Sequence, residues 1–389
     1  MGDHTMKSWP QYGTEEADAL LEVLNSGKWG STSGDVVATF EREFAAYQQA
    51  GHAVCLANGT LAIAVALKAA GVGIGDEVIV PPYTFIATAS AALFVGAVPV
   101  FADVDPDTHL LDPIATEAAI TERTKAVVVV HLAGRPADMD AFTALGAKYG
   151  LTIVEDAAQA HGAAYKGRAV GAIGDLGTFS FQSSKNITAG EGGVVVTDSP
   201  ELAGAVYSLV NVGRVPGGGW YQHETVGYNL RLTEFQAAIL RVQLRRHPQL
   251  QEVREGNARL LTDLLEKAPG ILLAPDDPVR GPPDGVCDGT VERAQVFVRK
   301  RGRLLDARKR DDLRGVESGS RDGEVLHGAL CLGGVQRVLR NMHLAHGVAL
   351  DAVLDVGHVF VLHVGQGCEA AAAVSPTMMS GTAVPSESR

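Results

Sequence analysis

The chain has 389 residues, of which 46% are apolar and 20% are charged, and its formal net charge is −12. The length favours two domains over a single hydrophobic core, and the composition is that of a globular protein and not of a disordered one. The negative charge argues against a nucleic acid or an anionic membrane as a partner, since both select basic surfaces, but small anionic ligands stay possible because backbone N–H groups can bind them.

The amino-terminal segment and the cysteines bear on the compartment. No apolar signal-peptide core follows Met1, and the longest apolar stretch, 89–101, is too short for a membrane span. The cysteines show no paired spacing, which indicates a reducing compartment and no zinc knuckle. They are Cys55, Cys287, Cys331 and Cys368. We therefore expect a cytoplasmic protein without a membrane segment or a structural metal.

The predicted elements alternate along the first part of the chain. Amphipathic helices at 15–27 and 35–51 each end at a glycine. Strands are predicted at 52–57, 76–82, 97–104, 125–134 and 151–158. Helices are predicted at 59–71, 84–96, 113–120, 138–150 and 249–270. Strands and helices that take turns in this way predict an α/β fold with a mostly parallel sheet covered by helices.

Polar residues follow four of these strands. They are Asn58-Gly59-Thr60, Tyr83-Thr84-Phe85, His131 and Glu155-Asp156. In open α/β sheets ligands bind at the carboxyl ends of the strands, and parallel strands end on one edge of the sheet. We therefore expect these residues to lie close together and to form a ligand site.

Each candidate also has an ordinary structural explanation. Asp156 either caps a following helix or faces a protonated ring nitrogen. Gly59 and Thr60 either form a plain turn or present the N–H groups of a helix start to a phosphate. Phe85 belongs either to the core or to a stack on a flat cofactor ring. The Ser180 hydroxyl serves either a phosphate or a buried backbone group.

A lysine stands in a glycine-rich loop between two strand-like runs, FSFQSSKNITAGEGGVVVTD at 179–198. A solvated surface cation is the ordinary explanation for Lys185. The order of the motifs favours another: a phosphate-type turn, an aromatic residue, a strand-end aspartate with Gln159, and then a serine and a lysine. Each of these signals is modest alone, but their joint order favours one shared site over a surface lysine.

From about residue 8 to 250 the sequence resembles the fold-type I, pyridoxal phosphate-dependent sugar aminotransferases of the DegT/DnrJ/EryC family. The resemblance rests on NGTLAIAVAL, GDEVIVPPYTFIAT, IVEDAAQAHGA, FSFQSSKNITAGEGG and GYNLRLTEFQAA. Within the family, SGKWG, VHLAGRPADMD, SFQSSK and NVGRVPGGGWYQH are most similar to the L-glutamine:scyllo-inosose and 2-deoxy-scyllo-inosose aminotransferases of aminoglycoside biosynthesis.

The resemblance implies a role for each matching residue around the cofactor ring. Lys185 would hold pyridoxal phosphate covalently and shuttle a proton during the reaction. Asp156 would pair with the ring nitrogen, Phe85 would stack on the ring, and Gln159 would lie near the ring hydroxyl.

The cofactor phosphate and the substrate pocket receive further residues from the resemblance. The phosphate would be cradled by Gly59, Thr60 and Ser180. Asn229 would reach it from a second subunit, so a homodimer with shared sites is implied. The acceptor pocket would be lined in part by Lys28, Trp29 and Tyr83.

The implied reaction moves the amino group of L-glutamine to a keto-cyclitol. One alternative is a nucleotide-keto-sugar aminotransferase that uses glutamate. A second is a pyridoxal phosphate-dependent dehydratase, although relatives that dehydrate typically carry histidine at the position of Lys185. A third is a non-catalytic cofactor-binding protein, or one whose activity is impaired by its carboxyl-terminal tail.

We expect two domains, a large cofactor-binding domain at 1–250 and a small domain at 251–389 that is family-like only to about residue 278. From residue 279 onward the chain has no Ile, Tyr or Trp and only two phenylalanines. Such a composition lacks the residues that build a core. We therefore expect the tail to be an out-of-frame translation of a GC-rich gene that supplies no site residues. The alternative is a divergent small domain, in which 349–365 forms a helix and a strand.

Overall fold

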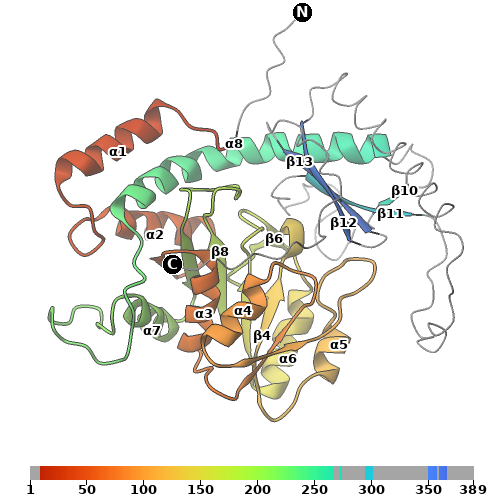
Figure 1. The fold of residues 1–389 in the computed structure, drawn as a ribbon, viewed down its shortest axis with the longest axis horizontal. Coiled ribbons are helices and arrows are strands. Elements are labelled where there is room, and N and C mark those ends of the chain that lie inside the picture. The colour runs from red at the N-terminus through yellow and green to blue at the C-terminus, as the bar shows by residue number, and fades with distance from the viewer. Residues whose placement is uncertain (1–8, 266–270, 274–293, 301–348, 357–358, 366–389) are drawn as a thin grey trace, which may run out of the picture.

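The computed structural model describes residues 9–265, 271–273, 294–300, 349–356 and 359–365 (Figure 1). A seven-stranded sheet has the order β1-β9-β8-β5-β4-β2-β3. Its strands are β1 (His52–Leu56), β2 (Glu77–Val80), β3 (Val98–Phe101), β4 (Thr124–Val130), β5 (Thr152–Asp156), β8 (Leu176–Ser180) and β9 (Gly193–Thr197). Neighbouring strands are parallel except where β9 pairs with β1 and with β8. The predicted mostly parallel α/β fold is confirmed.

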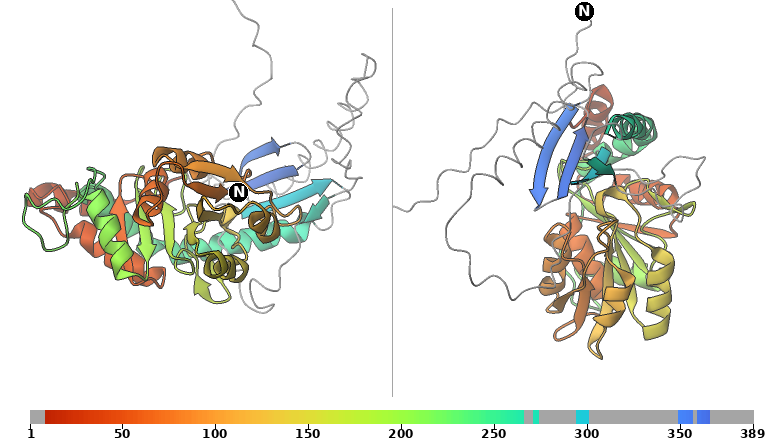
Figure 2. Two further views of the ribbon diagram at one scale, coloured as in Figure 1. Left: turned by 90° about the horizontal axis from the view of Figure 1, so that it is seen from below. Right: turned by 90° about the vertical axis from the view of Figure 1, so that its right-hand side faces the viewer.

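Helices cover both faces of this sheet (Figure 2). One face carries α3 (Gly59–Ala69), α4 (Ala87–Phe94) and α7 (Pro200–Val210). The other carries α2 (Val36–Tyr47), α5 (Pro113–Ala118), α6 (Met139–Tyr149) and α8 (Glu234–Leu265). Successive residues of β4 alternate between the two cores, with Val127 and Val129 in one and Ala126 and Val128 in the other. Burial on both faces explains the continuous runs of branched residues in these strands.

Shorter elements complete the large body. They are α1 (Thr14–Ser26), the 3-10 turn η1 (Leu132–Gly134) and the two-stranded ribbon of β6 (Ala164–Tyr165) and β7 (Arg168–Ala169). Helix α1 packs along α8 (Figure 1). Among the described helices, none combines the length and the apolar character needed to cross a bilayer.

Helix α8 starts earlier than the sequence indicated. It is 32 residues long and continues through Pro248, whereas we predicted a helix from residue 249. Its first half is buried, with Ala237, Leu240 and Leu244 in the core. This packing outweighs the hydrogen bond that a proline removes from a helix interior. The helix crosses residue 250, and the division into domains there stays a prediction.

A second sheet lies beside α8 in the order β10-β11-β13-β12 (Figure 1). Its strands are β10 (Ile271–Leu273), β11 (Ala294–Lys300), β12 (Ala349–Val356) and β13 (Val359–Gly365), all paired antiparallel. The alternative in which 349–365 forms a helix and a strand is therefore wrong in its helix. Residues 349–356 form strand β12, whose backbone groups pair with those of β13. Most residues after 279 lie outside the described residues, and the expectation of an out-of-frame tail stays a prediction.

The carboxyl group of Glu41 on α2 makes the stability of this fold depend on pH. Its Oε1 accepts a hydrogen bond from the Cys55 N–H group at 2.8 Å. Burial raises the pKa of Glu41 to about 7, against the smaller opposing effects of the Cys55 N–H group and the Arg42 charge. The folded chain therefore holds a proton that the unfolded chain releases near pH 4.5. The stability from this proton is full below that pH and is lost as the pH rises through about 7.

We expect Glu41→Gln to abolish this pH dependence, which amounts to at most roughly 3 kcal/mol of unfolding free energy. The measurement is chemical denaturation from about pH 5 to about pH 8. Glu201→Gln, on an exposed position of α7, is the control and should leave the profile of the parent protein. An equally steep profile in Glu41→Gln would contradict a proton held at Glu41.

Candidate active site

A fully buried carboxylate, Glu155, organises the carboxyl end of β5. It accepts a hydrogen bond from His131 Nε2 at 2.8 Å and others from the N–H groups of Gly171, Ile173 and Gly174 at 2.6 to 2.7 Å. Burial raises the pKa of Glu155, but these hydrogen bonds and the His131 ring outweigh burial and lower it. Glu155 and His131 therefore use their polar atoms in hydrogen bonds to each other and to the backbone. They act as structural residues at the carboxyl edge of the sheet.

Asp156, the next residue, is 6% exposed. Its Oδ2 accepts a hydrogen bond from Thr88 Oγ1 at 2.8 Å and its Oδ1 accepts one from the Ala158 N–H group at 3.2 Å. A turn and not a helix follows, so the helix-cap alternative is wrong. Burial raises the pKa of Asp156, and the two hydrogen bonds and the positive charge of Lys185 only partly oppose it. A cation placed against this carboxylate would favour its ionised form.

Lys185 lies in the loop between β8 and β9 and is half-buried. The loop is closed by backbone hydrogen bonds from Phe181 to Gly192 and from Ala189 to Phe181. The three residues after the lysine, 186–188, are buried and hold the loop in place. Because β8 runs parallel to β5 and ends at Ser180, the loop that carries Lys185 starts at the carboxyl edge of the sheet. The positive charge of Lys185 also opposes the rise in the pKa of Asp156.

The start of α3 abuts the end of β8. Asn58 caps the helix by accepting a hydrogen bond from the Leu61 N–H group at 2.9 Å. A Cβ atom on Gly59 would stand 2.7 Å from the Ser180 Cβ, so only glycine fits there. The first N–H groups of a helix have no partner within it and favour anions. Gly59 and the buried Ser180 are thus in contact beside Thr60 at the start of α3, which is the arrangement that an anion cradle would need.

Two predicted ring contacts lie on neighbouring loops. The Oε1 atom of Gln159 accepts a hydrogen bond from the Ala133 N–H group at 2.7 Å, which fixes its side chain. Phe85 is 71% exposed, so the alternative that it is a core residue is wrong. Tyr83 is half-buried, and its ring centroid lies 5.9 Å from that of His109.

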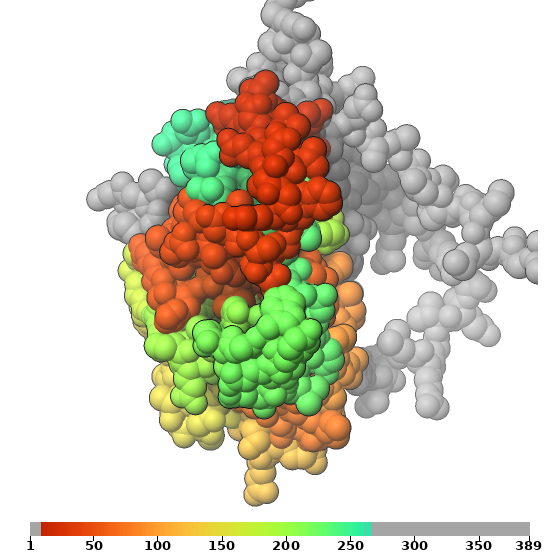
Figure 3. Space-filling view, turned by 90° about the vertical axis from the view of Figure 1, so that its left-hand side faces the viewer, coloured from red at the N-terminus to blue at the C-terminus, as the bar shows by residue number. Residues whose placement is uncertain are grey.

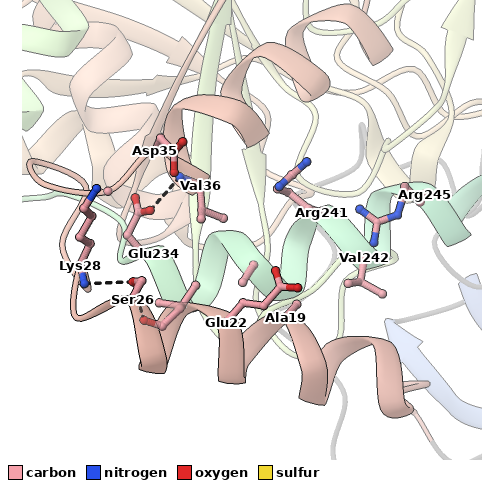
Figure 4. Close-up of a pocket in the computed structure, with 13 residues that line it drawn as sticks. Ala19, Glu22, Ser26, Lys28, Asp35, Val36, Glu234, Arg241, Val242 and Arg245 are labelled. Atoms are coloured by element: carbon pink, nitrogen blue, oxygen red, sulfur yellow. Dashed lines mark hydrogen bonds between the residues drawn. The ribbon is translucent and has the colours of Figure 1, made fainter.

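Lys28 lines a different cavity, of about 530 Å³, between α1, the start of α2 and α8 (Figure 4). The lining residues are Ala19, Glu22, Val23, Ser26, Lys28, Gly34, Asp35, Val36, Glu234, Ala238, Arg241, Val242 and Arg245. None of the residues expected to hold the cofactor is among them. Trp29 packs on Phe235 at the start of α8, with a centroid distance of 5.8 Å. The neighbouring Gln236 donates a hydrogen bond to the carbonyl of Glu191, so this region touches the end of the Lys185 loop.

Asn229 is exposed and lies at the base of a long surface segment, 212–228. An isolated backbone bridge to Asn211 closes this base. The segment carries strongly exposed aromatic rings, Trp220 and Tyr221 among them. In Figure 3 the green part of the chain, which includes this segment, protrudes below α1 and α2. The placement leaves the Asn229 side chain available to a second subunit.

Two residues at this edge were missed from the sequence, Thr88 and His161. Thr88 is fully buried, and its hydroxyl lies 3.0 Å from that of Thr84 while it donates to Asp156. The available signal was a lone threonine inside an apolar helix. His161 is also fully buried and stands two residues after Gln159. His161 is part of the motif IVEDAAQAHGA, but the sequence does not indicate which residues surround its side chain.

Comparison with known proteins gives a consistent result. The model of the DegT/DnrJ/EryC1/StrS aminotransferase family matches residues 10–300. The chain is 48% identical over 275 residues to an L-glutamine:2-deoxy-scyllo-inosose aminotransferase of Streptomyces lividus, a match that covers 67% of this chain. The chain spans 65% of the length of that relative.

Solved structures are similar as well. The crystal structure of 3-amino-5-hydroxybenzoic acid synthase has a TM-score of 0.71 and 41% identity, and the match covers 76% of this chain and 75% of the other. That of NtdA from Bacillus subtilis, with bound cofactor PMP, has a TM-score of 0.65 and 30% identity, with 74% and 63% covered.

The tight contact at Gly59 makes the anion cradle sensitive to a single methyl group. We expect Gly59→Ala to push α3 away from Ser180 at a cost of about 1–3 kcal/mol, and a cost of this size borne by the bound state lowers the affinity for pyridoxal phosphate about 5- to 150-fold. Affinity is measured by titrating the cofactor-free protein. Gly204→Ala in α7, where an added Cβ meets nothing within 4 Å, is the matched control. Unchanged affinity in Gly59→Ala would contradict a cradle at this contact.

Proposed function

The chain belongs to the DegT/DnrJ/EryC1/StrS aminotransferase family, and on this premise we propose that it moves the amino group of L-glutamine to a keto-cyclitol with pyridoxal phosphate as cofactor. The observation that carries the proposal is the half-buried Lys185, whose charge acts on the buried Asp156 carboxylate at the carboxyl edge of the sheet. The 48% identity to an L-glutamine:2-deoxy-scyllo-inosose aminotransferase supports the donor and the acceptor, scyllo-inosose or 2-deoxy-scyllo-inosose.

The residues present fit this cofactor. Gly59 leaves beside Ser180 the space that any Cβ would fill, at the start of a helix that favours a phosphate. Asp156 is a buried carboxylate with a raised pKa, and a protonated ring nitrogen would stabilise its charge. The PMP bound to the similar NtdA is consistent with the same choice. When bound, pyridoxal phosphate supplies a carbonyl that takes up the amino group and a ring that accepts electrons.

The side chains around the ring divide the work. Lys185 Nζ would hold the cofactor until the amino donor displaces it, and the freed amine would then take the proton from the α-carbon of the donor and deliver it to the cofactor. Asp156 would keep the ring nitrogen protonated, and Thr88 orients its carboxylate through the 2.8 Å hydrogen bond. Phe85 would stack on the ring, and Gln159 would lie near the ring hydroxyl.

The remaining proposals concern assembly and place. Asn229 reaches the phosphate of a neighbouring subunit in a homodimer, and its exposure beside the aromatic segment 212–228 supports this role. Tyr83 and Trp29 help to line the acceptor pocket. Lys28 lines the cavity between α1, the start of α2 and α8, so the structure gives less support to Lys28 as an acceptor-pocket residue. The protein works in the cytoplasm, in keeping with cysteines that have no paired spacing.

Turnover with defined substrates tests the function. We expect purified protein with L-glutamine to aminate scyllo-inosose or 2-deoxy-scyllo-inosose, detected by mass spectrometry, and Lys185→Ala to lose both turnover and the visible absorbance of a covalently held cofactor. Glutamate with a nucleotide keto-sugar is the comparison reaction. Activity only in the comparison would refute the cyclitol, and full activity of Lys185→Ala would refute the whole assignment.

Mixing two inactive variants tests the shared site. In a dimer of one Lys185→Ala subunit and one Asn229→Ala subunit, one site carries both defects and the other carries none, if Asn229 acts across the interface. We expect the mixture to regain activity, up to about a quarter of the parent level when the subunits assort randomly. Activity no greater than the sum of the two separate variants would show that Asn229 acts within its own chain.

A further inference from the structure

A fully buried histidine lies behind the Lys185 loop. His161 is 0% exposed and lies with Gln159 on the turn that follows Asp156, the last residue of β5. Its ring centroid lies 5.4 Å from that of Phe179 and 5.9 Å from that of Phe181. These two phenylalanines flank Ser180 at the end of β8. His161 therefore packs one side of the proposed site, the aspartate turn, against the other, the strand end that leads to Lys185.

A second buried histidine, His247, lies on α8. His247 of α8 is also 0% exposed, and its Nδ1 atom lies 2.8 Å from the hydroxyl of Tyr47 on α2. Its Nε2 atom is buried without a hydrogen-bond partner within the described part of the chain. A buried polar contact between His247 and Tyr47 thus joins α8 to α2.

The two buried histidines are uncharged near neutral pH. Burial, together with the positive charge of Lys185, which opposes a second one, holds the pKa of His161 well below its ordinary value. Burial and the charge of Arg254 lower the pKa of His247 to about 3. Neither ring can therefore take a proton from a substrate near neutral pH, and their contribution must come from geometry and from the absence of a second positive charge behind Lys185.

We propose that His161 is a positioning residue, which as a neutral ring fixes the distance between the Asp156 carboxylate and the Lys185 amine. This inference rests on the proposed function. His161 acts through the backbone, because its turn directly follows Asp156 at the end of β5 and its ring packs on Phe179 and Phe181 at the end of β8. The charge state of His161 is also coupled electrostatically to His247 of α8.

The test follows the pH at which the nitrogen joining Lys185 to bound pyridoxal phosphate loses its proton, read from the visible absorbance of the holoprotein. The negative charge of Asp156 favours the protonated form. If His161→Leu lets the turn and the strand end move apart, we expect the midpoint to fall by about one pH unit, a tenfold change in the proton affinity. His161→Gln keeps a polar N–H donor, so its midpoint should stay close to that of the parent protein.

Phe142→Leu is the matched control. Phe142 is buried in the same core but belongs to α6 and to neither the turn nor the strand end, so its variant should lower the melting temperature without moving the midpoint. If His161→Leu does not fold, His247→Phe is used, with a smaller shift expected in the same direction. A lower melting temperature with an unmoved midpoint would overturn the inference alone. Absence of the visible band in the parent protein would overturn the proposed function, and this inference with it.

Discussion

Four hydrogen bonds to the buried Glu155 carboxylate fix the edge of the sheet on which everything else at the candidate site is built. They join the end of β5 to His131 after β4 and to the segment that leads into β8. Removing one donor would leave part of a buried carboxylate without a hydrogen bond, at a cost of about 1–3 kcal/mol. Because side chains alternate along a strand, this anchor also sets the direction of the adjacent Asp156.

The two neighbouring carboxylates owe their different properties to their surroundings. Glu155 is saturated with donors, so its pKa is lowered despite burial. Asp156 receives two hydrogen bonds, and its pKa is raised by burial. A carboxylate in the first condition has no capacity left for a ligand, whereas one in the second gains from any cation placed against it. The number of hydrogen-bond donors around each carboxylate therefore separates the structural role of Glu155 from the ligand-facing role that we propose for Asp156.

The sequence predicted the strands and helices of the sheet well, because branched runs and amphipathic periods depend on local pattern. It also predicted that Gly59, Asp156, Ser180 and Lys185 meet at one edge, since parallel strands end together. It did not predict that α8 continues through Pro248, because the compensation comes from distant packing. The donor role of Thr88 and the position of His161 depend on contacts between segments far apart in the chain, and no local pattern carries them.

The contact of Gly59 with Ser180 has a consequence for folding. Gly59 and Ser180 are far apart in the sequence. They meet in the folded sheet, in which β1 pairs with β9 and β9 pairs with β8. Such non-local pairing makes a chain slow to fold, since loop entropy is lost before contacts form. An anion cradle that exists only in the assembled sheet binds its ligand only in the native state. A ligand bound there would stabilise the whole sheet by mass action, so the concentration of free ligand would set the fraction of chains that is folded.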